Sequence, residues 1–144
     1  MAYLVDYHCH TGLSADAKGS PREVCLRAVE IGLAELAFTD HVDTDPSDPC
    51  YGHYDYERAF EAAERCREEF AGRLAVRLGV EIDYQERHRD EAVRAIGGRG
   101  FDVVIGSVHY LAGRPGWIVP TTATPFAARS ARALTAIAAR TATR

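Results

Sequence analysis

Hydrophobic runs in this chain repeatedly end on a side chain that can bind a metal ion. Each run has the pattern of a strand, and the residues that close the runs are His8 with His10, then His41, Glu81 and His109. Parallel strands joined by helices bring their carboxyl ends to one rim, where the active sites of β/α enzymes lie. This recurrence therefore predicts several parallel strands whose ends form one site.

The segments between these runs have the patterns of helices. Ser20-Pro21-Arg22-Glu23 predicts a capping box that opens a helix, and Gly32 is expected to follow its end. Strands are expected over residues 3–8, 34–39, 74–82 and 102–108, and further helices over 55–70 and 86–96, with a surface loop over 42–54. The alternation predicts an α/β fold built on a parallel sheet or part of a barrel. We expect the first strand to be mostly buried and the fourth to be covered on both faces.

The charge of the chain is unevenly distributed along its 144 residues. All 21 acidic residues lie at or before Asp102, and the same part of the chain contains 12 Lys and Arg. The part after Asp102 contains five Arg and no acidic residue. The acidic part argues against a nucleic-acid partner and suits a site that gathers cations. No apolar run reaches the roughly 18 residues of a membrane span. Four separated cysteines and no signal peptide predict reduced thiols and a cytoplasmic location.

The residues at the strand ends are candidates for one metal site. Side chains two apart on a strand share a face, so His8 and His10 can bind the same ion. Asp16, as a loop aspartate, could instead be solvated, and His41 could instead be a core histidine bonded to a carbonyl. Glu81 interrupts a hydrophobic run and needs a partner, since burying an unpaired carboxylate is costly. Together the pattern favours metal ligation by His8, His10, Asp16, His41, Glu81 and His109.

The donor set indicates which metals and which chemistry to expect. Nitrogen and oxygen donors suit Zn, Mn or Fe better than Ca. Six candidates exceed the ligands of one tetrahedral ion, which favours a multinuclear site. Such sites activate water as a nucleophile and hold phosphoryl oxygens, and no motif for a protein nucleophile is present. Asp6 shares the strand face of His8 and His10 in a regular strand, and Asp6 and Asp40 are expected to orient the ligands from behind.

Four segments, in this order, resemble the metal motifs of the PHP (polymerase and histidinol phosphatase) superfamily. They are Asp6-Tyr7-His8-Cys9-His10, Thr39-Asp40-His41, Gly79-Val80-Glu81 and Gly106-Ser107-Val108-His109, and the last two look most like the histidinol-phosphatase branch. The resemblance implies a distorted (β/α)7 barrel with a trinuclear metal site. It implies one ion at His8, His10 and Glu81, a second bridged by Glu81 to His109, and a third at Asp16 and His41. It also implies hydrolysis of L-histidinol phosphate, a small phosphomonoester of histidine biosynthesis.

The second half of the family pattern is not matched. Relatives carry a further histidine and then an Asp-x-His, but no histidine follows His109 and no aspartate follows Asp102. Residues 1–120 are therefore expected to be the first part of a PHP domain. Residues 121–144, rich in Ala, Thr and Arg, are expected to be either a terminal helix over 126–140 or a non-native end of a truncated or frameshifted product. Two alternatives stay open: a phosphoesterase for nucleotides or nucleic-acid ends, and an inactive metal-binding fragment.

Overall fold

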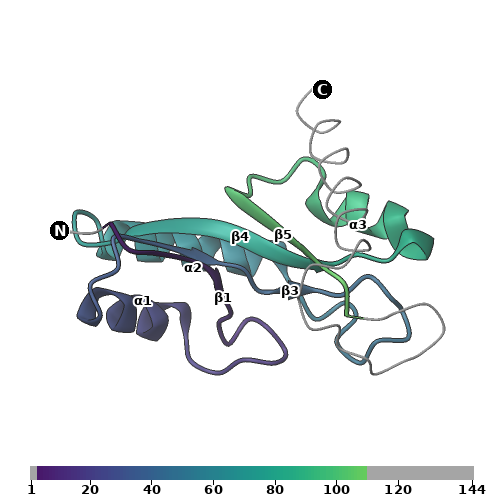
Figure 1. The fold of residues 1–144 in the computed structure, drawn as a ribbon, viewed down its shortest axis with the longest axis horizontal. Helices are drawn as coiled ribbons and strands as arrows, with labels where there is room; N and C mark the ends of the chain where they lie inside the picture. Colours follow the sequence, from purple (N-terminus) through teal and green to yellow (C-terminus); the bar gives the residue numbers. More distant parts are fainter. Residues whose placement is uncertain (1–2, 110–144) are drawn as a thin grey trace.

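The computed structural model describes residues 3–109 of the chain (Figure 1). Strands and helices alternate in this part, as the sequence predicts, and no membrane-crossing helix is found within it. The expected tail over 121–144 lies outside the described residues. In chain order the elements are β1 (Val5–Cys9), α1 (Pro21–Glu30), β2 (Glu35–Phe38), β3 (His41–Val42), α2 (Tyr56–Glu69), β4 (Ala75–Asp83), the 3-10 turn η1 (Glu86–His88), α3 (Arg89–Ile96) and β5 (Val103–Ser107).

The strands form one curled parallel sheet, which confirms the predicted α/β half-barrel. β1 pairs with β2, β2 pairs with the first half of β4, and β5 pairs with the second half of β4. The short β3 also pairs with β4 and continues the line of β2 after a break at Thr39-Asp40. The prediction of a loop from residue 42 was therefore wrong by one residue, because Val42 still pairs with Ile82.

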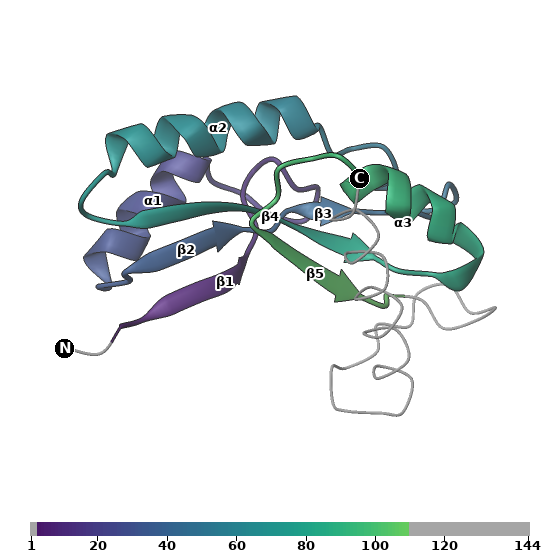
Figure 2. The ribbon, with the colours of Figure 1, turned by 90° about the horizontal axis from the view of Figure 1, so that it is seen from above.

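The helices cover one face of the sheet (Figure 2). Ser20 caps α1 with the predicted capping box, and Gly32 follows the helix with a positive φ of 80°. One core lies between α1, α2 and the outer face of β2 and β4, and includes Leu36, Phe38 and Leu78. A second core joins α3 to the other half of β4. All four cysteines are free thiols.

The two outermost strands are more exposed than the sequence predicts. Val5 and Tyr7 in β1 are 42% and 41% exposed, and Val104 in β5 is 41% exposed. The predictions of a mostly buried first strand and a doubly covered fourth strand were therefore wrong for the described residues. The physical reason is position, because within residues 3–109 β1 and β5 lie at the margins of the sheet and each pairs with one neighbour. A hydrophobic run alone does not distinguish a central strand from a marginal one.

Gly79 allows the sheet to be close-packed at the break between β2 and β3. A Cβ atom there would lie 2.8 Å from Cγ2 of Thr39 and 3.0 Å from the carbonyl oxygens of both Phe38 and Val103. The two carbonyls belong to neighbouring strands and cannot move freely. We expect Gly79→Ala to lower the free energy of unfolding by about 1–3 kcal/mol, measured by urea denaturation. Gly100→Ala is the control, because its Cβ would meet only the Tyr56 hydroxyl at 3.7 Å, and an equal loss in both variants would contradict this explanation.

Candidate metal centre

A bulge in β1 turns His8 and His10 toward the inner face of the sheet. Val5 pairs with Glu35 and Asp6 with Leu36, but Cys9 pairs with Phe38, so one extra residue is accommodated between Asp6 and Cys9. The extra residue reverses the alternation of faces that follows it. Cys9 then packs with the helix-side core. In an unbulged strand of the same sequence, Cys9 would take the inner face and the two histidines would point toward the helices.

The other candidate ligands reach the same place from neighbouring strands. His41 in β3 is in register with Glu81 in β4, so the two side chains start side by side on the inner face. His109 follows β5, and its backbone N–H donates to the Asp83 carboxylate at 2.9 Å. Asp16 lies in the loop after β1, where it accepts a hydrogen bond from Ser14. All six residues that the sequence singles out are therefore brought together.

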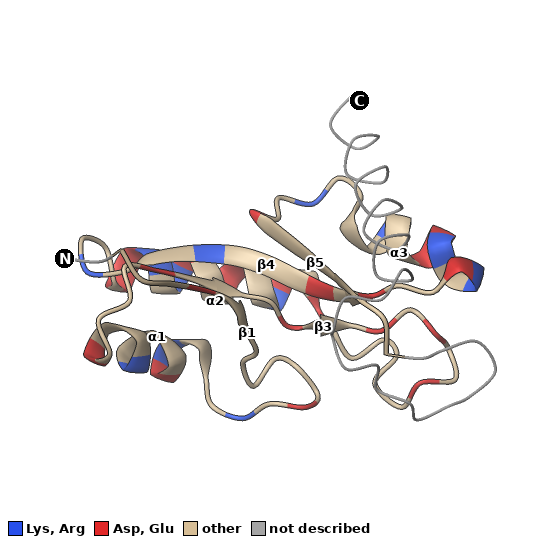
Figure 3. Cartoon of the chain, in the orientation of Figure 1, with Lys and Arg blue, Asp and Glu red and all other residues tan. Residues whose placement is uncertain are grey.

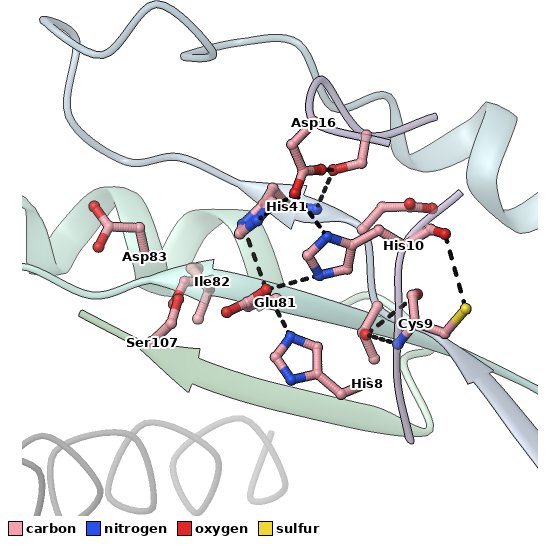
Figure 4. A network of polar contacts seen from close by, with 12 residues as sticks. His8, Cys9, His10, Asp16, His41, Glu81, Ile82, Asp83 and Ser107 are labelled. Carbon is pink, nitrogen blue, oxygen red and sulfur yellow. Dashed lines mark hydrogen bonds and ion pairs between the residues drawn. The ribbon is translucent and has the colours of Figure 1, made fainter. Parts of the chain in front are cut away.

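Glu81 lies at the middle of the cluster (Figure 4). Its Oε2 atom is 2.9 Å from Nε2 of His8, 2.9 Å from Nε2 of His10 and 3.5 Å from Nδ1 of His41. Its Oε1 atom is 3.7 Å from Nε2 of His109. Donor atoms that bind one ion at about 2.0–2.2 Å lie roughly 3–3.5 Å from each other, and the four distances here, from 2.9 to 3.7 Å, are close to that spacing.

Three overlapping groups of donors can each hold an ion. They are His8, His10 and Glu81; His10, Asp16 and His41; and His41, Glu81 and His109. Within each group the donor atoms lie within 4.8 Å of one another. The groups share His10, His41 and Glu81, so ions bound in them would be close neighbours. This sharing is the geometry that a multinuclear site requires.

The electrostatics of the cluster favour added positive charge. Burial opposes the ionisation of Glu81, but the surrounding histidines, led by His109 and His8, outweigh it and hold the pKa of this carboxyl well below its usual range. Asp43 and Glu81 together raise the pKa of His109 to about 10. A bound cation would replace the proton that the raised pKa of His109 otherwise favours.

The rings of His10 and His41 each have a nitrogen that a metal ion could bind. His10 points Nδ1 at Asp16, 3.0 Å away, and Nε2 at Glu81, so a neutral ring with one proton cannot donate to both carboxylates. Nδ1 of His41 is buried and has no hydrogen-bond partner among the described residues. A metal ion beside Glu81 would give both rings a partner for a lone pair.

Two further carboxylates lie near His109 and were not predicted from the sequence as ligands. Oδ1 of Asp43 and Oδ1 of Asp83 each lie 3.8 Å from Nδ1 of His109, and the three residues form another group able to hold an ion. Both follow a recognised ligand by two positions, Asp43 after His41 and Asp83 after Glu81, so spacing along a strand was the available signal. Acidic residues gather in this part of the molecule, on the loop after β3 and at the end of β4 (Figure 3).

Asp6 and Asp40 support the backbone next to the histidines. Asp6 accepts a hydrogen bond from the backbone N–H of His8 at 3.0 Å, and its register with Leu36 places it on the opposite face from the site. The prediction that it shares the face of His8 and His10 was wrong, because it assumed a regular strand. Asp40 is buried and accepts hydrogen bonds from the N–H and hydroxyl of Thr11, the residue that follows His10. It therefore fixes the chain where His10 enters the site.

Fold and site together define a parallel β/α protein with a multi-histidine candidate metal centre at the carboxyl ends of its strands. The PHP domain family model matches residues 6–138, and the chain belongs to this family. A probable histidinol-phosphatase of Deinococcus radiodurans is 39% identical over 114 residues, which cover 77% of this chain and 44% of that protein. The chain thus spans less than half the length of this relative.

A solved structure and a second class of relative extend the comparison. The histidinol phosphate phosphatase of Lactococcus lactis, crystallised with zinc, L-histidinol and phosphate, superposes with a TM-score of 0.70 and 30% identity, covering 75% of this chain and 41% of that one. An error-prone DNA polymerase of Cutibacterium acnes is 40% identical over 62 residues, 42% of this chain and 5% of that protein. The similarity to phosphatases is therefore the more extensive.

Proposed function

We propose that this chain carries the metal-binding part of a phosphomonoesterase whose substrate is L-histidinol phosphate, in the cytoplasm and in histidine biosynthesis. The observation that carries the proposal is the convergence of four histidines, Asp16 and Glu81 on the carboxyl ends of parallel strands. The similarity to histidinol-phosphatases over three quarters of the chain supports the choice of substrate. The chain spans less than half the length of these relatives, so the activity of the whole protein is part of the proposal.

We infer that the centre holds Zn, Mn or Fe ions, up to three in number, in the three overlapping groups. Imidazole and carboxylate donors suit these metals, and the buried Nδ1 of His41, which makes no hydrogen bond within the described residues and lies 3.5 Å from Oε2 of Glu81, fits an additional cation. When bound, such ions supply positive charge for phosphoryl oxygens and lower the pKa of water to make a nucleophile near neutral pH.

The residues of the chain have separate tasks in this proposal. Glu81 would hold bound cations and offset their charge, since both its oxygens face histidine nitrogens. His10 holds a position between Glu81 and Asp16, with the Asp40–Thr11 hydrogen bonds fixing the backbone beside it. A small phosphomonoester is the partner that such a cationic centre selects, through its dianionic phosphate.

A phosphoesterase acting on nucleotides is the second candidate. The similarity to an error-prone DNA polymerase favours it, although that similarity covers 42% of the chain. The excess of acidic residues before Asp102 weighs against a long nucleic acid, but not against a mononucleotide. A metal-binding chain without activity is the third, because the later family ligands have no match after His109.

Phosphate release by the purified 144-residue protein separates these candidates. The protein is loaded with Mn or Zn and given L-histidinol phosphate or nucleoside monophosphates. We expect faster release from L-histidinol phosphate, and loss of this release in Asp16→Asn. The control is His53→Ala, which removes an exposed histidine outside the centre. Faster release from nucleotides would replace the substrate assignment, and no release despite bound metal would leave the inactive chain as the answer.

A further inference from the structure

Three polar side chains follow one another on the inner face where β4 ends. Glu81, Asp83 and Gln85 are two residues apart, so they share a face of the strand. The alternation reaches Gln85 because Tyr84 still pairs with β5, where its backbone N–H donates to a carbonyl. All three polar side chains are buried. Glu81 is a candidate ligand, and Asp83 and Gln85 are buried polar groups that need partners of their own.

Each carboxylate oxygen of Asp83 has a fixed partner. Oδ1 accepts a hydrogen bond from the backbone N–H of His109 at 2.9 Å, and Oδ2 accepts one from Nε2 of Gln85 at 2.8 Å. Asp83 is fully buried, and a carboxylate buried in this way is costly unless hydrogen bonds satisfy it. The amide of Gln85 therefore fixes the orientation of the carboxylate that holds the backbone of His109.

Arg87 determines which end of the Gln85 amide faces Asp83. Its Nε atom donates to Oε1 of Gln85 at 3.1 Å, so the acceptor end of the amide is occupied and the donor end is directed at the carboxylate. The same guanidinium donates to Asp45 through Nη2. Asp45 lies in the loop after β3, which also carries Asp43, so Arg87 ties η1 to the loop on the other side of the metal centre.

The hydrogen bonds that start at Gln85 end at a candidate ligand. Nδ1 of His109 lies 3.8 Å from Oδ1 of Asp83, and its Nε2 lies 3.7 Å from Oε1 of Glu81. The ring thus turns Nε2 toward the donor group that it forms with His41 and Glu81. We propose that Gln85 is a positioning residue of the metal centre, which holds Asp83, and through it His109, in the geometry that binds an ion.

Thr44 provides a matched control beside the same aspartate. Its hydroxyl is also buried, and it donates at 2.7 Å to the backbone carbonyl of Asp83 instead of the carboxylate. Gln85→Met and Thr44→Val each keep the approximate size of the side chain and remove one buried hydrogen bond next to Asp83. Both variants are expected to lose some stability, because each leaves an acceptor without its donor. Only Gln85→Met releases the carboxylate.

Calorimetric titration of the metal-free 144-residue protein with Zn or Mn tests the proposal. Gln85→Met is expected to weaken the binding of one ion by about tenfold or more, the effect of losing a partner behind a histidine ligand. Thr44→Val is expected to bind metal as tightly as the unchanged chain. Adding Gln85→Met to His109→Ala is expected to cost no further affinity, because Gln85 acts through His109. Equal losses in Gln85→Met and Thr44→Val, or a loss that adds to that of His109→Ala, would overturn the proposal.

A second measurement needs no metal, so it separates this inference from the proposed metal centre on which it rests. Amide hydrogen exchange at His109, followed by NMR in the metal-free protein, is expected to be at least about tenfold faster in Gln85→Met than in Thr44→Val. If the unchanged chain binds no metal but shows this difference, the metal centre is contradicted and the hold of Gln85 on His109 stands. Equal exchange in the two variants would overturn the inference whatever the metal content.

Arg87→Ala tests the same inference if circular dichroism shows that Gln85→Met is unfolded. The Arg87 side chain is 60% exposed, so its removal leaves the core intact. The Gln85 amide is then free to turn its acceptor end toward Asp83. We expect weaker binding of one ion and faster exchange at the His109 amide, in the same direction as for Gln85→Met. A folded Arg87→Ala protein with unchanged metal affinity and unchanged exchange would contradict the proposal.

Discussion

Glu81→Gln is expected to remove most of the metal from this protein. Glutamine keeps the size of the side chain and removes its charge, so the variant isolates the electrostatic part of Glu81. Its carboxylate oxygens face four histidines, and two of the three donor groups contain it. Loss of a group that merely supports a ligand costs roughly 10–100-fold in metal affinity, and loss of a shared ligand is expected to cost about 100-fold or more.

Metal content after dialysis, measured by elemental analysis, and titration with Zn or Mn check this expectation. Glu35→Gln is the control, because Glu35 is also a strand glutamate on the inner face and binds Tyr3 and Arg77 instead of histidines. We expect the control to keep its metal even if its stability falls. Equal metal content in Glu81→Gln and the unchanged protein would exclude Glu81 as the shared ligand.

The position of the site could be predicted because parallel strands impose it. Once the runs ending at His41, Glu81 and His109 are parallel neighbours, their carboxyl ends lie on one rim whatever the details of packing. The register then brings His41 and Glu81 side by side, as the structure shows. Ligand positions that follow from the parallel direction of the strands could therefore be predicted from the sequence.

Features that depend on a one-residue shift in strand register could not be predicted from the sequence. The sequence Asp6-Tyr7-His8-Cys9-His10 fits a regular strand, in which Asp6 shares a face with both histidines. The bulge breaks this relation and places Asp6 opposite. Hydrogen bonding between β1 and β2 decides where the extra residue goes, including the bond from the backbone N–H of Cys9 to the Thr39 hydroxyl. These contacts join residues 30 positions apart, which local patterns do not record.

His10→Ala is expected to reduce metal binding more than His8→Ala, although both histidines come from the same motif. The side chain of His10 is 17% exposed and that of His8 is 56% exposed. His10 contacts Glu81 and Asp16, whereas His8 contacts Glu81 alone among the carboxylates. His10 therefore belongs to two donor groups and His8 to one.

The difference between the two variants distinguishes shared ligands from independent ones. If the groups share ligands, His10→Ala loses metal from two positions and His8→Ala from one, so elemental analysis gives a lower metal content per chain for His10→Ala. The double variant should then resemble His10→Ala, because removing His8 adds little once the group it shares with His10 is broken. Equal losses that add in the double variant would mean that each histidine binds separately, and the overlapping arrangement around Glu81 would be wrong.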